Sequence, residues 1–256
     1  KGGKAMIHFV GAGSGAVDLI TVRGQRLLEN ADVVIYAGSL VNPELLEYTK
    51  KDCKIFNSAY MTLEEVIAEM VSAEENGLET VRLHTGDPSI YGAIREQIDG
   101  LERLGIKYDI CPGVSSFFAA AATLGIEYTL PDVSQSLIIT RAEGRTPVPE
   151  GEKLKSFASH QSTMVLFLSS GLVGKVQKEL IEGGYLPDTP AAVVYKASWS
   201  DEKKFVTTIG RLEETMKKEN ITKTALIIVG KVLGNEYSRS KLYDGEFTTE
   251  YRRGTK

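Results

Sequence analysis

The sequence is poor in the residues that build metal centres and disulfide frameworks. Among its 256 residues there are two cysteines and three histidines, all far apart along the chain. Cys53 and Cys111 lack the spacing of metal ligands, and we expect both to be reduced thiols with a structural role. His8, His84 and His160 are equally scattered. The sequence therefore predicts no metal site.

The chain also lacks a charge excess and long apolar runs. Thirty Lys and Arg residues against 34 Asp and Glu residues give a formal charge of -4, which argues against a nucleic-acid partner. The longest apolar runs, such as Met164–Leu168, are strand-sized and far below the roughly 20 residues that cross a bilayer. No segment is organised like a signal peptide. We expect a cytoplasmic protein without a membrane partner, and leave open whether Lys1–Ala5 are native.

Glycine is abundant instead. There are 25 glycines, roughly a tenth of the chain, against about 7% in average usage. They follow no three-residue period, which excludes a collagen-like chain. Several of them gather where predicted strands end, and this clustering needs an explanation.

Short β-branched runs alternate with amphipathic helical stretches, a pattern typical of α/β proteins with mainly parallel sheets. The stretch Thr129–Asp132 reads as a linker, so we expect two α/β domains, at residues 1–130 and 131–256. In the second domain, Phe205–Ile209 follows the strand Ala191–Tyr195 too closely for a crossover helix. This spacing predicts an antiparallel pair and a mixed sheet. In the first domain we expect a helix over Tyr91–Leu104.

The first glycine-rich turn, Gly11–Ala16, follows a predicted strand and formally fits the dinucleotide-binding pattern G-x-G-x-x-G/A. That pattern also needs a helix that starts within the glycines and an acid at the end of the second strand. Here the helix is delayed to about Thr21, and the second strand ends at Tyr36-Ala37 without an acid. A nicotinamide site and a turn without a ligand remain alternatives. We favour a turn that brings backbone close to some ligand.

Two further turns follow predicted strands in the same domain. His84–Gly92 contains Gly86, which permits close approach, and Asp87, which offers a ligand contact or an Asx-type cap. Pro112–Ser116 contains Gly113 and two hydroxyls that are either helix caps or ligand contacts. Ligands of open α/β sheets bind at the carboxyl ends of strands. Three such turns therefore predict one shared cleft.

With these motifs the chain resembles the tetrapyrrole methyltransferases, also called class III S-adenosylmethionine-dependent methyltransferases. The resemblance rests on Gly11–Gly15 with Asp18–Thr21, on Gly86–Pro88 with Ile90–Gly92, and on Pro112–Ser116 with Ala119–Ala122. It extends from about Met6 to Val232. Within the family, Thr140–Glu150 and Val194–Trp199 look like the branch that methylates C11 of precorrin-4 or cobalt-precorrin-4 in cobalamin synthesis.

The resemblance implies two α/β domains with a cofactor trough between them, a homodimer and S-adenosyl-L-methionine as methyl donor, leaving S-adenosyl-L-homocysteine as product. It implies donor contacts at Ser14, Thr85, Gly86, Asp87, Ile90, Ser115, Ser116, Leu168 and Ala197. We also expect Gly11, Gly13 and Tyr91, which lie in the same turns, to bind the donor. Two positions depart from the family's pattern. Ser14-Gly15-Ala16 stands where the family usually has Pro-Gly-Asp, and Ala37 stands where relatives that methylate uroporphyrinogen carry an aspartate assigned as a base. No catalytic residue is therefore assigned.

A tetrapyrrole substrate carries many carboxylates, so an acidic enzyme needs local positive charge to bind it. Arg141, Arg145 and Lys196 are the candidates, since arginine binds carboxylates in a bidentate manner. Solvated loop charges are the alternative. Tyr91 and Trp199 either stack on the ring or serve packing alone. The other functions left open are a different cobalamin- or sirohaem-pathway methyltransferase, a nicotinamide-dependent oxidoreductase and a non-catalytic nucleotide-binding module.

Overall fold

The computed structural model describes residues 5–255, so most of Lys1–Ala5, the possible extension, lies outside the described residues. The chain divides into two compact units. Unit 1 comprises the chain up to Ala119 together with Ala197–Asp201, and unit 2 comprises Ala120–Lys196 and Glu202–Lys256. The division into domains at residues 130 and 131 stays a prediction.

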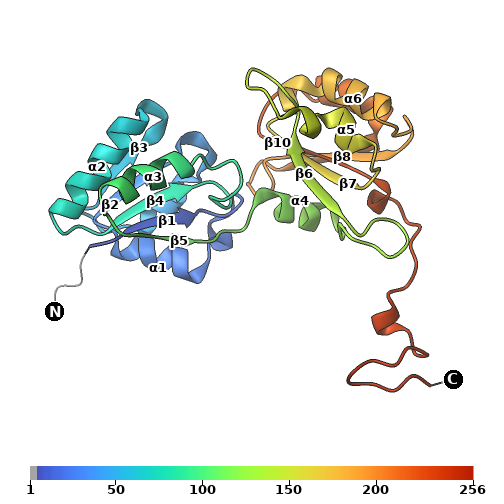
Figure 1. Cartoon of the computed structure of the whole chain (residues 1–256), viewed down its shortest axis with the longest axis horizontal. Coiled ribbons are helices and arrows are strands. Elements are labelled where there is room, and N and C mark those ends of the chain that lie inside the picture. Colours follow the sequence, from blue (N-terminus) through green and yellow to red (C-terminus); the bar gives the residue numbers. More distant parts are fainter. Residues whose placement is uncertain (1–4, 256) are drawn as a thin grey trace. The chain divides into compact units, whose positions relative to one another are not determined.

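Unit 1 is built on a five-stranded sheet in the order β3-β2-β4-β1-β5, with every pairing parallel. Its strands are β1 (Ile7–Gly11), β2 (Val33–Tyr36), β3 (Lys54–Asn57), β4 (Thr80–His84) and β5 (Tyr108–Cys111). The helices are α1 (Val22–Asn30), α2 (Leu63–Glu75), α3 (Arg95–Arg103) and the first turn of α4 (Ser116–Leu124). Figure 1 shows α1 on one face of this sheet and α2 and α3 on the other. The parallel sheet predicted for the first domain is confirmed.

Alternation along the strands explains why both faces of the sheet are covered. In β1, Val10 packs in the core cluster that contains Leu28 of α1, whereas Phe9 packs in the cluster with Met70 of α2 and Leu101 of α3. Successive strand side chains point to opposite faces, so β1 and β2 each supply both clusters. The outcome is a doubly covered parallel sheet.

Local signals fix the starts of α1 and α2 in unit 1. The Thr21 hydroxyl accepts from the Gly24 N–H at the start of α1. The Thr62 hydroxyl accepts from the Glu65 N–H while the Glu65 carboxylate accepts from the Thr62 N–H, a capping box that opens α2. The helix expected over Tyr91–Leu104 is shorter than predicted and begins only at Arg95. Tyr91 and Ala93 have φ angles of 55° and 50°, which no right-handed helix accepts.

Unit 2 carries a second five-stranded sheet in the order β6-β7-β10-β8-β9. Its strands are β6 (Leu137–Arg141), β7 (Thr163–Phe167), β8 (Pro190–Tyr195), β9 (Lys203–Thr208) and β10 (Ala225–Val229), with helices α5 (Leu154–Ala158), α6 (Val173–Glu182) and α7 (Leu212–Lys218). Only β6 and β7 pair in parallel; the other three pairings are antiparallel. The predicted mixed sheet and the antiparallel β8–β9 pair are confirmed, and α5 is an element that the sequence pattern did not indicate.

Candidate functional site

The three glycine turns meet at one edge of the unit 1 sheet. In the parallel ladders, Gly11 at the end of β1 pairs with His84 at the end of β4, and Val10 pairs with Cys111 of β5. Because these strands are adjacent and end at the same level, the chain leaves all three at the same place. The shared location predicted for the three turns is therefore present within unit 1.

The glycines let the three backbones touch. A Cβ atom on Gly11 would lie 2.5 Å from Gly113 Cα and 2.6 Å from the Gly86 carbonyl oxygen. A Cβ atom on Gly113 would lie 2.7 Å from Gly11 Cα and closer still to the Gly86 oxygen. No side chain fits at either position without moving backbone. At Gly86 the reason for glycine is different. A Cβ atom there would make only ordinary contacts, but the φ of +60° lies in the left-handed region that favours glycine.

Hydrogen bonds join the three turns. The Ala12 N–H donates to the His84 carbonyl at 2.7 Å, and Gly13 and Gly86 exchange bonds through N–H and carbonyl groups at 3.2 and 2.8 Å. The Gly113 N–H donates to Asp87 Oδ2 at 2.8 Å. The first turn is thus tied to the second by backbone, and the second to the third by a carboxylate.

Asp87 is an anchor inside this arrangement. Its Oδ1 accepts from the Ser89 N–H at 2.9 Å and from the Ser89 hydroxyl. Burial alone would raise the pKa of Asp87, but the bonds from Ser89 and the Gly113 N–H outweigh burial and lower the pKa below its usual value. Asp87 is therefore a carboxylate at neutral pH, and both of its oxygens already have partners.

The first turn has two backbone donors to spare. Ser14 is 4% exposed and Gly15 is also buried. Neither of their N–H groups makes a hydrogen bond to any acceptor within residues 5–255. A buried N–H without a partner is rare in proteins and costs free energy. These two adjacent donors suit an acceptor group of a ligand.

The remaining residues predicted to bind the donor in unit 1 flank these turns. Ser115 is buried, and a Cβ atom on Gly86 would lie 3.4 Å from its Cα. Thr85 is exposed, while Ile90 and Ser116 are partly buried. Tyr91, at 46% exposed, sits in the left-handed conformation between the second turn and α3. Ala197 is buried in the segment of unit 1 that follows β8. Their contacts with a ligand stay predictions.

Polar side chains alternate along β4, the strand that leads into the second turn. Thr80, Arg82 and His84 alternate on one face of the strand and are all buried. Arg82 donates to Gln97 Oε1 at 2.9 Å, to the Ile35 carbonyl at 3.1 Å and to Ser58 Oγ at 3.1 Å. Burial lowers its pKa to about 10, so it stays charged at neutral pH. No prediction from the sequence included this arginine, although a charged residue alternating with apolar residues in a strand is a signal of a buried polar role.

His84 is a neutral imidazole. Its Nε2 is buried without a hydrogen-bond partner among the described residues. Burial, and secondly the charge of Arg82, lower the pKa of His84 to about 3. The ring stacks on Phe9, with centroids 6.2 Å apart. His84 therefore contributes no positive charge next to the second turn at physiological pH.

The other predicted residues lie in unit 2, on one edge of its sheet. Arg141 ends β6 and pairs with Phe167 of the parallel strand β7, just before Leu168. Strand β8 runs antiparallel to β10, which runs antiparallel to β7, so Lys196 after β8 lies at the same edge. Leu168 and Lys196 both have left-handed backbones, with φ angles of 51° and 46°. Strain of this kind is common at functional sites.

The three predicted substrate-binding cations have different surroundings. Arg141 holds its own loop, donating to the Thr146 carbonyl at 3.2 Å and the Pro147 carbonyl at 2.8 Å. The Lys196 Nζ lies 5.5 Å from the centre of the Tyr195 ring. Arg145, by contrast, is exposed and forms no hydrogen bond or ion pair with another residue of the 5–255 range. Of the three cations, Arg145 is therefore the best suited to bind a carboxylate of a ligand.

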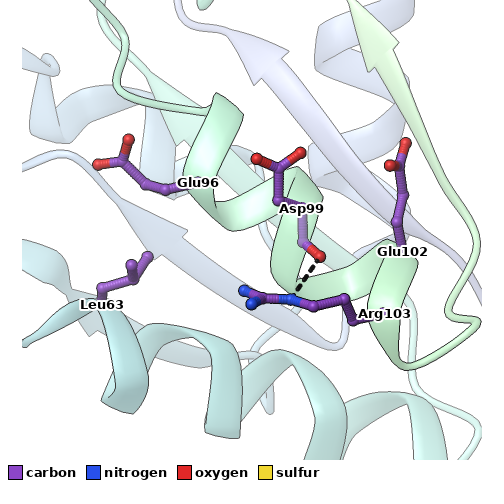
Figure 2. A pocket seen from close by; sticks show the side chains of 5 residues that line it. All are labelled: Leu63, Glu96, Asp99, Glu102 and Arg103. Carbon is purple, nitrogen blue, oxygen red and sulfur yellow. Dashed lines mark hydrogen bonds between the residues drawn. The ribbon is translucent and has the colours of Figure 1, made fainter.

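Two surface grooves of unit 1 lie away from the glycine turns. One is lined by Leu63, Glu96, Asp99, Glu102 and Arg103, and Figure 2 shows Arg103 donating to the Asp99 carbonyl. Three carboxylates would repel a polycarboxylate ligand. The other contains His8, with Nδ1 2.6 Å from Asp109 Oδ1, and lies at the amino ends of β1, β2 and β4. Neither groove fits a cofactor expected at the carboxyl ends of the strands.

Comparison with known proteins agrees with this geometry. The chain is 60% identical to a cobalt-precorrin-4 C(11)-methyltransferase of Methanocaldococcus jannaschii over 251 residues, 98% of this chain and 97% of that protein. The X-ray structure of a cobalt-precorrin-4 methyltransferase superposes with a TM-score of 0.90 at 48% identity, covering 92% of this chain and 98% of the other. A uroporphyrin-III C-methyltransferase from Thermus thermophilus in complex with S-adenosylhomocysteine gives 0.75 at 26% identity, with coverage of 90% and 93%.

The family comparison covers both units. Residues 6–213 match the family described as Tetrapyrrole (Corrin/Porphyrin) Methylases, a span that includes all three glycine turns, Arg141 and Arg145. None of the helices among the described residues has the length and apolar character needed to cross a membrane. The α/β fold predicted from the sequence is that of the superposed methyltransferases. The order of the glycine turns, the fold and the full-length similarity lead to one conclusion, that the chain belongs to the tetrapyrrole methylase family.

Proposed function

We propose that this protein is an S-adenosyl-L-methionine-dependent methyltransferase that acts on C11 of precorrin-4 or cobalt-precorrin-4. The observation that carries the proposal is the junction of the three turns, where Gly11, Gly86 and Gly113 touch and the N–H groups of Ser14 and Gly15 remain without a partner among residues 5–255. The names of the similar proteins support the choice of substrate and ring position.

The residues at the junction fit a bound methyl donor. S-adenosyl-L-methionine supplies an electrophilic methyl group on a sulfonium. The spare donors of Ser14 and Gly15 suit its carboxylate or hydroxyl groups, and glycine backbones allow close approach without interference from side chains. The turns are already tied together by Asp87 and by the Gly13–Gly86 bonds, so little ordering is left to occur upon binding.

The chain's own contribution to methyl transfer is then orientation. Holding donor and acceptor carbon in line can supply several kcal/mol of the barrier. His84, neutral with a pKa of about 3, is too weak a base to take a proton from the substrate at neutral pH. We assign no general base. Arg145, Arg141 and Lys196 are proposed to bind substrate carboxylates, with Arg145 the most available of the three.

The test combines binding and product analysis on the full chain. Calorimetry with S-adenosylhomocysteine and with NADH should give binding of the first alone. Incubation with methyl-¹³C donor and either precorrin-4 or cobalt-precorrin-4 should give a labelled methyl group at C11 by ¹³C NMR, and the faster of the two substrates shows whether cobalt is required. A methyl group at another ring carbon would replace the proposal with a different tetrapyrrole methyltransferase. NADH binding without S-adenosylhomocysteine binding would overturn it altogether.

A homodimer and a cytoplasmic location belong to the same proposal. The homodimer rests on the family resemblance, and the cytoplasmic location rests on the two cysteines that we expect to be reduced thiols. Light scattering coupled to gel filtration tests the first, since a homodimer has twice the 28.0 kDa of one chain. Cell fractionation tests the second.

A further inference from the structure

The segment Ala197–Asp201, which follows β8, belongs to unit 1 and contacts the first glycine turn. The Trp199 Nε1–H donates to the Ser14 carbonyl at 3.1 Å. The Ser198 hydroxyl lies 2.8 Å from the Ser14 hydroxyl and accepts from the Ala16 N–H at 3.1 Å. Three hydrogen bonds thus join two residues of this segment to a turn that lies more than 180 positions earlier in the sequence.

The indole of Trp199 also packs directly on Gly15. A Cβ atom on Gly15 would lie 2.8 Å from Trp199 Cγ and closer still to Cδ1 and Nε1. Gly15 is thus required by this contact, independently of its backbone angles. From another direction, the Asn42 side-chain amide donates to the Gly15 carbonyl at 2.9 Å.

These contacts leave a distinct pattern of used and unused groups in the turn. The carbonyls of Gly13, Ser14, Gly15 and Ala16 all accept a hydrogen bond, and the N–H of Ala16 is bound by Ser198. The donors without an intramolecular acceptor in the described chain are the N–H groups of Ser14 and Gly15. Each of the four carbonyls already accepts a hydrogen bond, so the backbone groups of this turn that still lack any partner among the described residues are these two donors.

Ser198 holds its position at a cost. Its φ is 67°, a left-handed conformation that is uncommon for a residue other than glycine. A backbone of this kind persists only where surrounding contacts over-determine it, and the bonds to Ser14 and Ala16 are such contacts.

We propose that Ser198 and Trp199 are positioning residues of the methyl-donor site, which hold the Gly13–Ala16 turn so that the N–H groups of Ser14 and Gly15 face the bound donor. The inference rests on the proposed function, because it presumes that this turn binds the donor. Neither residue needs to touch the donor. Loosening the turn should weaken donor binding while leaving tetrapyrrole binding intact.

The test uses two variants that spare the fold and one matched control. Trp199→Phe keeps an aromatic ring on Gly15 but removes the N–H. Ser198→Gly removes the hydroxyl and relieves the left-handed backbone, so it should not destabilise the segment through strain. Ser200→Ala, in the same segment, changes an exposed hydroxyl that makes no hydrogen bond to another described residue.

Calorimetry with S-adenosylhomocysteine and steady-state kinetics give the readouts. We expect the Kd for S-adenosylhomocysteine and the KM for the methyl donor to rise about five-fold in Trp199→Phe, the effect of one hydrogen bond. Ser198→Gly, which loses two bonds, should raise them about five- to twenty-five-fold. The KM for the tetrapyrrole should match the wild type in both variants, and the thermal midpoint should fall by no more than the roughly 2–8 °C that one or two lost hydrogen bonds cost. Ser200→Ala should match the wild type in everything.

Trp199 is the single tryptophan of the chain, so its fluorescence reports on this contact alone. In Ser198→Gly we expect its emission to move to longer wavelength, and S-adenosylhomocysteine should reverse the change. Wild-type affinity for the donor in both variants would overturn the inference while the proposed function stood. A lower midpoint with unchanged affinity would overturn it too, since the contact would then be structural alone. Failure of the wild type to bind S-adenosylhomocysteine would instead defeat the proposed function.

Discussion

Replacing Gly113 by alanine should disrupt the junction of the three turns, because the added methyl group would meet the backbone of both other turns. Gly113 does not have a positive φ, so an alanine there pays no conformational penalty and the cost comes from contacts alone. The new methyl carbon would lie 2.7 Å from Gly11 Cα and 2.9 Å from the Gly11 carbonyl carbon, against about 3.5 Å or more for ordinary carbon contacts. It would be nearer still to the Gly86 carbonyl oxygen.

The magnitude follows from what would have to move. Overpacking of well-packed regions costs about 1–3 kcal/mol, and the upper end applies because the neighbours are backbone atoms. A shift of almost an ångström would also weaken the bond from the Gly113 N–H to Asp87, at about 1 kcal/mol. The free energy of unfolding should therefore fall by about 3–4 kcal/mol. For a chain of this size the thermal midpoint should fall by about 6–16 °C.

Thermal and urea denaturation measure this loss, and calorimetry with S-adenosylhomocysteine measures the accompanying loss of affinity. Gly151→Ala is the matched control, because Gly151 has nothing within 4 Å of its Cβ position and no positive φ. It should stay within about 0.5 kcal/mol of the wild type. If Gly113→Ala also stays within that range and binds S-adenosylhomocysteine normally, the argument that these backbones are in obligatory contact is wrong.

Three other predictions, one of them with a matched control, concern separate parts of the structure. Gly86→Ala should cost about 1–2 kcal/mol through its φ of +60°, and Gly77→Ala, with φ +70° and open space around it, should cost a similar amount without affecting donor binding. Arg145→Ala should raise the KM for the tetrapyrrole about ten-fold and leave the Kd for S-adenosylhomocysteine unchanged; an unaltered KM would reject its carboxylate role. The pKa of His84 is lowered to about 3, so between pH 6.5 and 3 the unfolded chain binds a proton that the native one does not. Over this range the free energy of unfolding should fall by about 1.4 kcal/mol for each pH unit that the pH is lowered, and His84→Phe should remove this dependence. If the free energies of unfolding of the two proteins vary with pH in the same way, the argument from burial of His84 is wrong.

Periodicity and capping signals predicted the order of the strands and of the longer helices, because each signal is encoded over a few neighbouring residues. Thr62 and Glu65 specify the start of α2 in this way. The predicted start of α3 was wrong for an equally local reason. Tyr91 and Ala93 have left-handed backbones, and neither residue type signals this conformation in the sequence. The short helix α5 was missed because five residues carry too little of a 3.6-residue period to recognise.

The features of the site likewise separate into those encoded by neighbouring residues, which could be predicted, and those made by residues far apart in the sequence, which could not. That glycine turns follow β1, β4 and β5 could be predicted from their sequences, and parallel pairing then brings them together. That Trp199 packs on Gly15 could not, because the two are 184 positions apart and nothing in either local sequence points to the other. The sequence pattern could have indicated that Arg82 is a buried charged residue. It could not have indicated its hydrogen-bond partners, because Gln97 and Ser58 come from two other elements.

The excess of glycine has several separate physical causes, which composition merges into one number. Gly86 serves backbone conformation, with a φ that an L side chain resists. Gly11 and Gly113 have ordinary angles and serve contact between backbones. Gly15 serves contact with an indole ring. Substitution by alanine at the first kind costs strain alone, whereas at the other kinds it displaces neighbouring elements. Damage to donor binding should therefore follow the distance from each Cβ position to its nearest fixed neighbour rather than the sign of φ.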